Sequence, residues 1–188
     1  MSRLETRARR VLMPLIQGHS HSLSTFDQHI LASWIAKTVM VAEYVHPTHI
    51  AIPDSHRLRM YASQEPPEGW QIWIAHYAGI KWRNLAIYHH MGGLANPSAL
   101  DTQFTSIGMG HLFIQVVSTT VPGIEFGPED GSELRQIWPR TSLDINWPAC
   151  RALTDRAADY VAASPSRMAG DASLLNLWAG APNRSAVA

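Results

Sequence analysis

The spacing of apolar residues changes along this chain from a helical period to an alternating one, and this change limits the folds that it can adopt. Up to residue 63, apolar side chains recur at three- and four-residue intervals, which is typical of helices that bury one face. From Trp70 to Tyr77 the side chains alternate, as in a half-buried strand. Helices followed by strands predict an α+β fold in which N-terminal helices pack on one face of an antiparallel meander.

Helix start and stop signals divide the first part of the chain. Ser2 and Glu5 have the spacing of a capping box, and the helix that follows is expected to end or bend at Pro14 and to close at Gly18. The strongest helical stripe runs over residues 23–45, with Ser24 and Asp27 as a second capping pair. A shorter helix is expected between residues 53 and 65, where two prolines follow.

The second part of the chain predicts three to four strands and a closing helix. A hairpin across Gly79 would join the first two strands, which cover residues 70–77 and 81–91. Residues 103–119 are interpreted as a third strand, bent at Gly108 or Gly110, and residues 134–139 as a short fourth strand. The closing helix is expected over residues 147–164.

Length and composition limit the possible classes of protein. The 188 residues fit a single domain, predicted over residues 1–163, with a loose tail over 164–188. The formal net charge is zero, so no basic field covers the whole molecule. Cys150 is the one cysteine, which excludes an intramolecular disulfide and a cysteine-based zinc site within the chain. With no signal peptide and no membrane span in the sequence, we expect a cytoplasmic protein that does not bind membranes.

Ten histidines suggest a metal site as one hypothesis. If the predicted strands are neighbours, about 4.8 Å apart, then His76, His111 and either His89 or His90 share a sheet face and reach one metal ion. Asp54 or Glu68 would add a carboxylate, with Asp54 as a base, and a metal-bound water would be the nucleophile of a small hydrolase. The divalent ion, such as zinc, is expected only under this hypothesis. The opposing interpretation is that these histidines are scattered structural residues.

The segment Gly18-His19-Ser20-His21-Ser22 raises a second catalytic hypothesis, with Ser20 as the nucleophile of an esterase. A nucleophile elbow joins a strand to a helix, however, and the preceding residues have a helical pattern. We therefore interpret this segment as a polar connection between two helices.

Arginines near the N-terminus suggest a binding surface. Arg3, Arg7 and Arg10 fall on one helical face and are candidates for contacts with the phosphates of nucleic acid. A solvated amphipathic helix is the alternative. A protein partner or a homo-oligomer also remains possible.

Four phrases, "MSRLETRARRVLMPLIQG", "ASWIAKTVMVAEY", "TSIGMGHLFIQV" and "QIWPR…INWP", resemble a family of uncharacterised bacterial proteins often labelled HNH-endonuclease-like. In that family a cysteine-rich, zinc-binding start leads through a Cys-Asn-x-Gly-Trp phrase into a similar helix. The resemblance covers residues 1 to about 155 and implies the fold of the trailing domain, together with an association with nucleic-acid processing.

This chain lacks the residues that would bind zinc and catalyse cleavage in that family. No cysteine precedes Cys150 and the histidine-asparagine-histidine constellation is missing, so no nuclease residue can be carried over to it. We expect either a fragment or a chain that works without the zinc-binding module. The favoured hypothesis is a non-catalytic binding or accessory domain. The sequence does not decide whether the chain is an enzyme. The small metal-dependent hydrolase, acting on an ester, lactone or phosphodiester, is the alternative.

Overall fold

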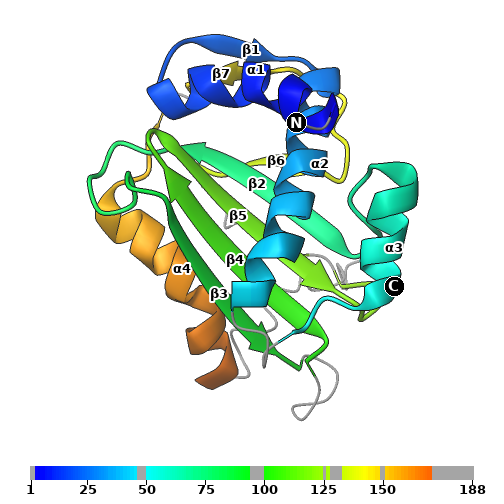
Figure 1. Cartoon of the computed structure of the whole chain (residues 1–188). Helices are drawn as coiled ribbons and strands as arrows, with labels where there is room; N and C mark the ends of the chain where they lie inside the picture. The colour runs from blue at the N-terminus through cyan, green and yellow to red at the C-terminus, as the bar shows by residue number, and fades with distance from the viewer. Residues whose placement is uncertain are drawn as a thin grey trace, which may run out of the picture.

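A five-stranded antiparallel sheet forms the centre of the molecule, with the strand order β3-β4-β5-β2-β6. The computed structural model shown in Figure 1 describes residues 3–45, 50–93, 100–124, 126–127, 133–148 and 151–170. The strands of the sheet are β2 (Trp70–His76), β3 (Ala86–Gly92), β4 (Thr102–Met109), β5 (Leu112–Thr119) and β6 (Arg135–Trp138). A separate two-stranded ladder pairs β1 (His21–Leu23) with β7 (Ile145–Trp147).

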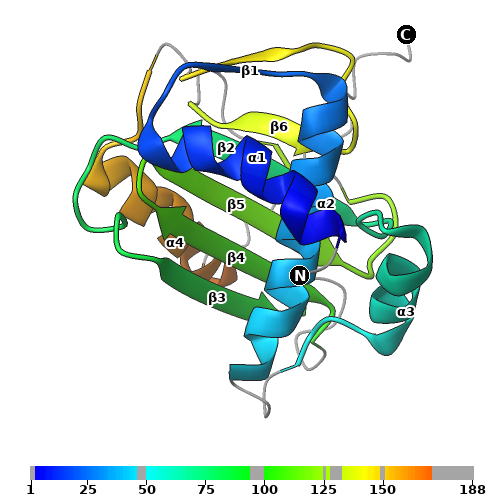
Figure 2. The ribbon, with the colours of Figure 1, turned by 45° about the horizontal axis from the view of Figure 1, so that its top comes forward.

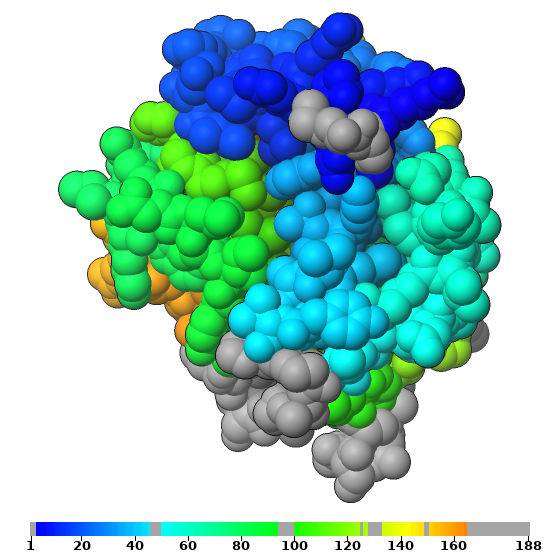
Figure 3. All heavy atoms as spheres, viewed as in Figure 1, coloured from blue at the N-terminus to red at the C-terminus, as the bar shows by residue number. Residues whose placement is uncertain are grey.

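Helices cover both faces of this sheet. α1 (Arg3–Gln17) and α2 (Thr25–Ala42) lie on one face, and α4 (Asp155–Gly170) lies on the other, as the two ribbon views show together (Figures 1 and 2). A short 3₁₀ turn, η1 (Glu43–Val45), follows α2, and α3 (Asp54–Ser63) precedes β2. The α+β prediction is confirmed, although helices cover two faces of the sheet and not one. In the space-filling view α1, α2 and α3 occupy the same side of the molecule (Figure 3).

Two hydrophobic cores, one on each face of the sheet, hold these layers together. The α1–α2 face buries aliphatic side chains of the helices against Ile72, Ile74 and Ile114. The α4 face is mainly aromatic, with Trp73, Tyr77 and Phe113 among its buried side chains. Every residue from Trp70 to Ala75 in β2 is buried, since this strand faces a core on both sides.

The predicted helix ends near the N-terminus match the structure in most respects. α1 passes through Pro14 and ends at Gln17, so of the two outcomes expected for Pro14, ending the helix is wrong. The amides of Gly18 and His19 donate to the carbonyls of Leu15 and Pro14, at 3.1 and 2.9 Å, which is a Schellman motif with Gly18 at φ +72°. The second capping pair is confirmed, because Ser24 and Asp27 form a complete capping box on α2.

The hairpin expected across Gly79 is wrong. β2 pairs with β5 and β6, whereas β3 pairs with β4 at the edge of the sheet. The chain leaves β2 through residues 77–85, and the carboxylate of Asp155 holds this connection by accepting hydrogen bonds from the amides of Ile80 and Lys81. A strand buried on both faces belongs in the sheet interior, and the more exposed β3 belongs at the edge.

The segment expected to be one bent strand is two strands. Gly110 and His111 form the loop of a two-residue hairpin between β4 and β5, with Met109 opposite Leu112. Gly110 is the first residue of this loop and has φ +58°, the conformation for which hairpins use glycine. The short fourth strand is confirmed as β6.

The closing helix starts later than expected, at Asp155, because the chain first pairs with the end of β2. The amide of Leu153 donates to the carbonyl of His76 at 2.7 Å, and the amide of Ala78 donates to Leu153 at 3.0 Å. α4 continues to Gly170, beyond the start predicted for the tail, and residues 171–188 lie outside the described part. Within the described residues no helix combines the length and apolarity needed to cross a membrane.

Candidate functional site

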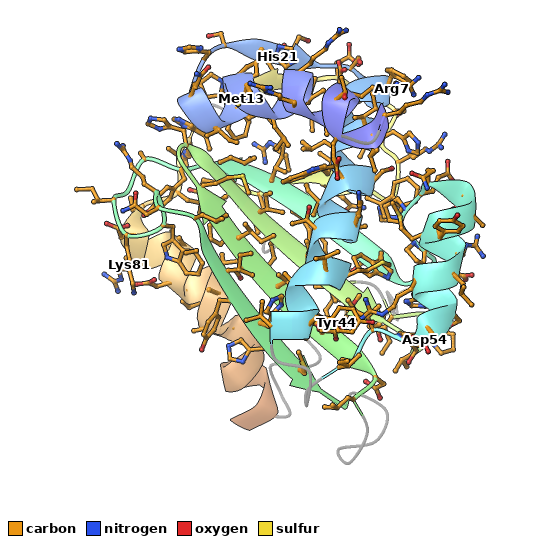
Figure 4. All side chains as sticks on the ribbon, viewed as in Figure 1. Arg7, Met13, His21, Tyr44, Asp54 and Lys81 are labelled. Atoms are coloured by element: carbon orange, nitrogen blue, oxygen red, sulfur yellow. The ribbon has the colours of Figure 1, made fainter. Side chains whose placement is uncertain are left out.

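The exposed side of α1 carries a row of arginines, which is the first candidate site. Ala8, Val11, Leu12 and Leu15 bury the opposite side of the helix in the core. The guanidinium-bearing residues Arg3, Arg7 and Arg10, together with Thr6, line a shallow concavity of about 390 Å³. We call these three arginines the arginine face. Arg7 extends into solvent at the N-terminal end of the helix (Figure 4).

The charge of the arginine face is not neutralised by described carboxylates. Glu5, the acidic residue within the same helix, forms an ion pair with Lys37 of α2, with an Nζ–Oε1 distance of 2.8 Å. Among the described residues, Arg3, Arg7 and Arg10 form no ion pair. A local positive surface therefore exists on a chain whose formal net charge is zero.

Two of the predicted metal ligands lie side by side at one end of the sheet. The rings of His76, at the end of β2, and His111, in the β4–β5 loop, stack with their centroids 5.6 Å apart and an interplanar angle of 22°. We call these residues the histidine pair. The indole of Trp147 meets the ring of His76 edge-on, at 5.7 Å between centroids. Both histidines are half-buried, so their rings remain accessible from solvent.

Main-chain contacts fix the position of His111. Its amide donates to the carbonyl of Ile16 at 2.9 Å, and its Nδ1 lies 3.1 Å from the carbonyl oxygen of Tyr77. A carbonyl only accepts hydrogen bonds, so this contact requires the proton on Nδ1 and leaves the lone pair of a neutral ring on Nε2. Burial, and secondarily the charge of His111, lowers the pKa of His76 and favours its neutral form.

The other two predicted ligands lie elsewhere. His89 and His90 are on β3, which β4 and β5 separate from β2, so they are about 14 Å across the sheet from the strand of His76. Through β4 and β5, His89 is level with Ile72, four residues before His76. His89 instead bonds the hydroxyl of Thr105, at 2.9 Å, and His90 packs against Tyr88. The three-histidine arrangement is therefore not formed.

The carboxylates expected to complete a metal site are also remote. Asp54 is the first residue of α3, and Glu68 precedes β2, so both lie near the beginning of that strand and His76 lies at its end, about 20 Å away. Across the described part of the chain, no group of three or more histidine, cysteine, aspartate or glutamate side chains is positioned to hold a metal ion. Of the metal ligands that the hydrolase hypothesis requires, the structure brings two together. No third ligand lies beside them among the described residues.

Ser20 is exposed in the connection from α1 to β1. This is a helix-to-strand connection, the reverse of the strand-to-helix turn on which a serine nucleophile is presented. The residues beside it contribute to packing: His21 lies opposite Trp147 in the β1–β7 ladder, and Gly18 lies against the ring of His111. Sequence reasoning interpreted this segment as a connection between helices and missed its short strand.

Comparisons with protein-family models, curated proteins and solved structures found no match to this chain.

A groove that sequence reasoning missed lies between the start of α3 and the end of β5. It has a volume of about 600 Å³, and Ser55, His56, Glu68 and Thr120 are among its lining residues. The indole Nε1–H of Trp70 donates to Nδ1 of His56 at 3.1 Å, which places the proton of the neutral ring on Nε2. Burial, and then the positive charge of Arg59, lowers the pKa of His56. Nothing in the local sequence pattern pairs His56 with Trp70, fourteen residues away.

Proposed function

We propose that this chain is a non-catalytic accessory domain that binds the phosphate backbone of nucleic acid through the arginine face. The observation that carries the proposal is the placement of Arg3, Arg7 and Arg10 around one concavity, without described acidic partners. The resemblance to the trailing part of HNH-endonuclease-like proteins points in the same direction.

The chemistry of the side chains supports phosphate as the ligand. A guanidinium group presents a planar fork of N–H donors that matches two phosphate oxygens, and it stays charged at any physiological pH. Seven residues of α-helix separate Arg3 from Arg10, which corresponds to about 10.5 Å along the axis. The face therefore spans several phosphates of one strand.

The packing of α1 argues for binding that does not depend on base sequence. Its buried side chains attach the helix to α2 and the sheet, so only one side of the helix is accessible to a ligand. A helix held in this way can contact the backbone, and Thr6 between the arginines adds a polar contact. Contacts to phosphate position a protein on nucleic acid without reading its sequence.

A charge-matched pair of variants tests this proposal. The triple variant R3Q/R7Q/R10Q removes the arginine face, and R59Q/R151Q/R156Q removes the same total charge from exposed positions elsewhere. Fluorescence anisotropy with a labelled duplex at low salt is expected to show at least a tenfold loss of affinity for the first variant and less than about a threefold loss for the second. Equal losses in both variants would show that the arginine face has no special role.

A further inference from the structure

We propose that the histidine pair, His76 and His111, binds one divalent transition-metal ion. Zn²⁺ represents this class of ion in the experiments below. This site is separate from the arginine face and does not depend on the function proposed for it. It also differs from the three-histidine hydrolase site predicted from the sequence. It uses only the two histidines that lie at the same end of the sheet, and none from β3.

The separation of the two rings suits a shared ion. A Zn–N bond of about 2.0–2.1 Å places an imidazole centroid about 3.2 Å from the metal, so two ligands at a tetrahedral angle have centroids about 5 Å apart. The observed separation of 5.6 Å is close to this value. The ring planes are only 22° apart, so one ring has to turn about its side-chain bonds for both in-plane lone pairs to point at the same ion.

The hydrogen bond of His111 is the kind that orients a metal ligand. Metal-binding histidines donate their second ring N–H to a carbonyl or carboxylate, which fixes the tautomer and aims the other nitrogen at the metal. His111 has this partner in the carbonyl oxygen of Tyr77. Its Nε2 lone pair is therefore available without any rearrangement of the β4–β5 loop.

The surroundings of His76 leave its nitrogens free for coordination. Among the described residues its ring pairs with the rings of His111 and Trp147, and neither contact uses a ring nitrogen of His76 in a hydrogen bond. Trp147 is 3% exposed, and its Nε1–H has no acceptor among the described residues. A polar occupant next to His76 would offer the indole such an acceptor.

Two protein ligands leave at least two positions of a tetrahedral zinc ion to water or to another ligand. The expected site is therefore accessible and weaker than a four-ligand structural site. It would tie the end of β2 to the β4–β5 loop, whose His111 also supports the α1–β1 connection at Gly18.

Zn²⁺ titration of the metal-stripped protein by isothermal calorimetry tests the site, with H76Q and H111Q as variants and H89Q and H90Q as matched controls. We expect one ion per chain, at least a tenfold loss of affinity in each of the first two variants, and less than about a twofold change in each control. Absence of saturable binding in the wild type, or equal losses in all four variants, would overturn the proposal.

Histidine NMR signals of the wild-type protein provide a readout that does not depend on any variant folding. Zn²⁺ is expected to shift the ring resonances of His76 and His111 and to leave those of His89 and His90 in place. Shifts confined to other histidines would contradict the assignment of the ligands.

Discussion

The ring of His111 occupies the space that a side chain at Gly18 would need: a β-carbon built on Gly18 would lie 2.9 Å from its Cδ2 atom. This contact joins the end of α1 to the β4–β5 hairpin. It explains why the residue that ends the helix is small as well as conformationally free.

The substitution G18A is therefore expected to be more destabilising than backbone strain alone requires. Gly123 is a matched control, because its φ of +73° is nearly the same and no atom of the neighbouring described residues lies within 4 Å of the place that a β-carbon would take there. We expect G123A to reduce the free energy of unfolding by about 1 kcal/mol and G18A by about 1 kcal/mol more. Urea denaturation measures both, and equal losses would show that the His111 contact costs nothing.

Removal of the buried carboxylate of Glu43 is expected to be the most damaging single change. This side chain is fully buried, accepts from the amides of Ala51 and Ile52, and forms an ion pair with Arg57. The substitution E43A leaves the guanidinium half-buried without its partner, so we expect a loss of about 3–5 kcal/mol in the free energy of unfolding.

Glu68 provides the control for Glu43, because it is exposed and forms no ion pair among the described residues. E68A is expected to change the free energy of unfolding by less than about 0.5 kcal/mol. A loss below about 1 kcal/mol for E43A, measured by the same denaturation, would contradict the role assigned to this ion pair.

The burial of His56, and secondarily the positive charge of Arg59, predicts a pH dependence of stability. The pKa of His56 is lowered in the folded state, below the value of 6.5 that applies when the chain is unfolded. Between the folded and the unfolded pKa of His56, the unfolded chain binds more protons than the folded chain. The contribution of neutral His56 to the free energy of unfolding is therefore complete above pH 6.5 and is lost as the pH falls through the folded pKa. Protonation would also place an N–H of His56 against the indole N–H of Trp70.

The variant H56N keeps an acceptor near the position of Nδ1 and cannot titrate. Its Tm is expected to fall less than that of the wild type between about pH 7.5 and pH 5, whereas H19N, at an exposed position, should behave like the wild type. Removing the positive charge of Arg59 with R59Q should raise the pKa of His56, as followed by NMR. Identical pH profiles for H56N and the wild type would exclude this effect.

A fluorophosphonate probe is expected not to label Ser20. The residue lies between a helix and a strand, in the order opposite to that of a nucleophile elbow, and it forms no hydrogen bond to a histidine in the described structure. Mass spectrometry of the treated protein measures the modification. Stoichiometric labelling that disappears in S20A would restore the esterase hypothesis.

Local patterns were sufficient to predict the helices and the α+β class. The Ser24–Asp27 capping box and the long apolar stripe after it depend on residues three or four apart, and such signals survive in the folded chain. The two-residue loop at Gly110 also has a local signal, since glycine stands first in it and the alternation changes phase across it, with Ile107 and Ile114 paired on one face.

The order of the strands could not be predicted in the same way. Alternation in β2 and β3 indicates that each is a strand and does not indicate which strand each one pairs with. The β1–β7 ladder joins segments of three residues each that are more than a hundred residues apart. For the same reason the sequence grouped His89 or His90 with His76 and His111, whereas in the sheet only His111 of these lies beside His76.

The salt dependence of duplex binding tests the central claim most directly. Each phosphate neutralised by a side chain contributes about −0.9 to the slope of log association constant against log salt concentration, so three arginines predict a contribution of about −2.7. The wild type should show this dependence, and R3Q/R7Q/R10Q should have a slope shallower by about that amount. Equal slopes for the two proteins, or no binding of the wild type at low salt, would contradict phosphate recognition by α1.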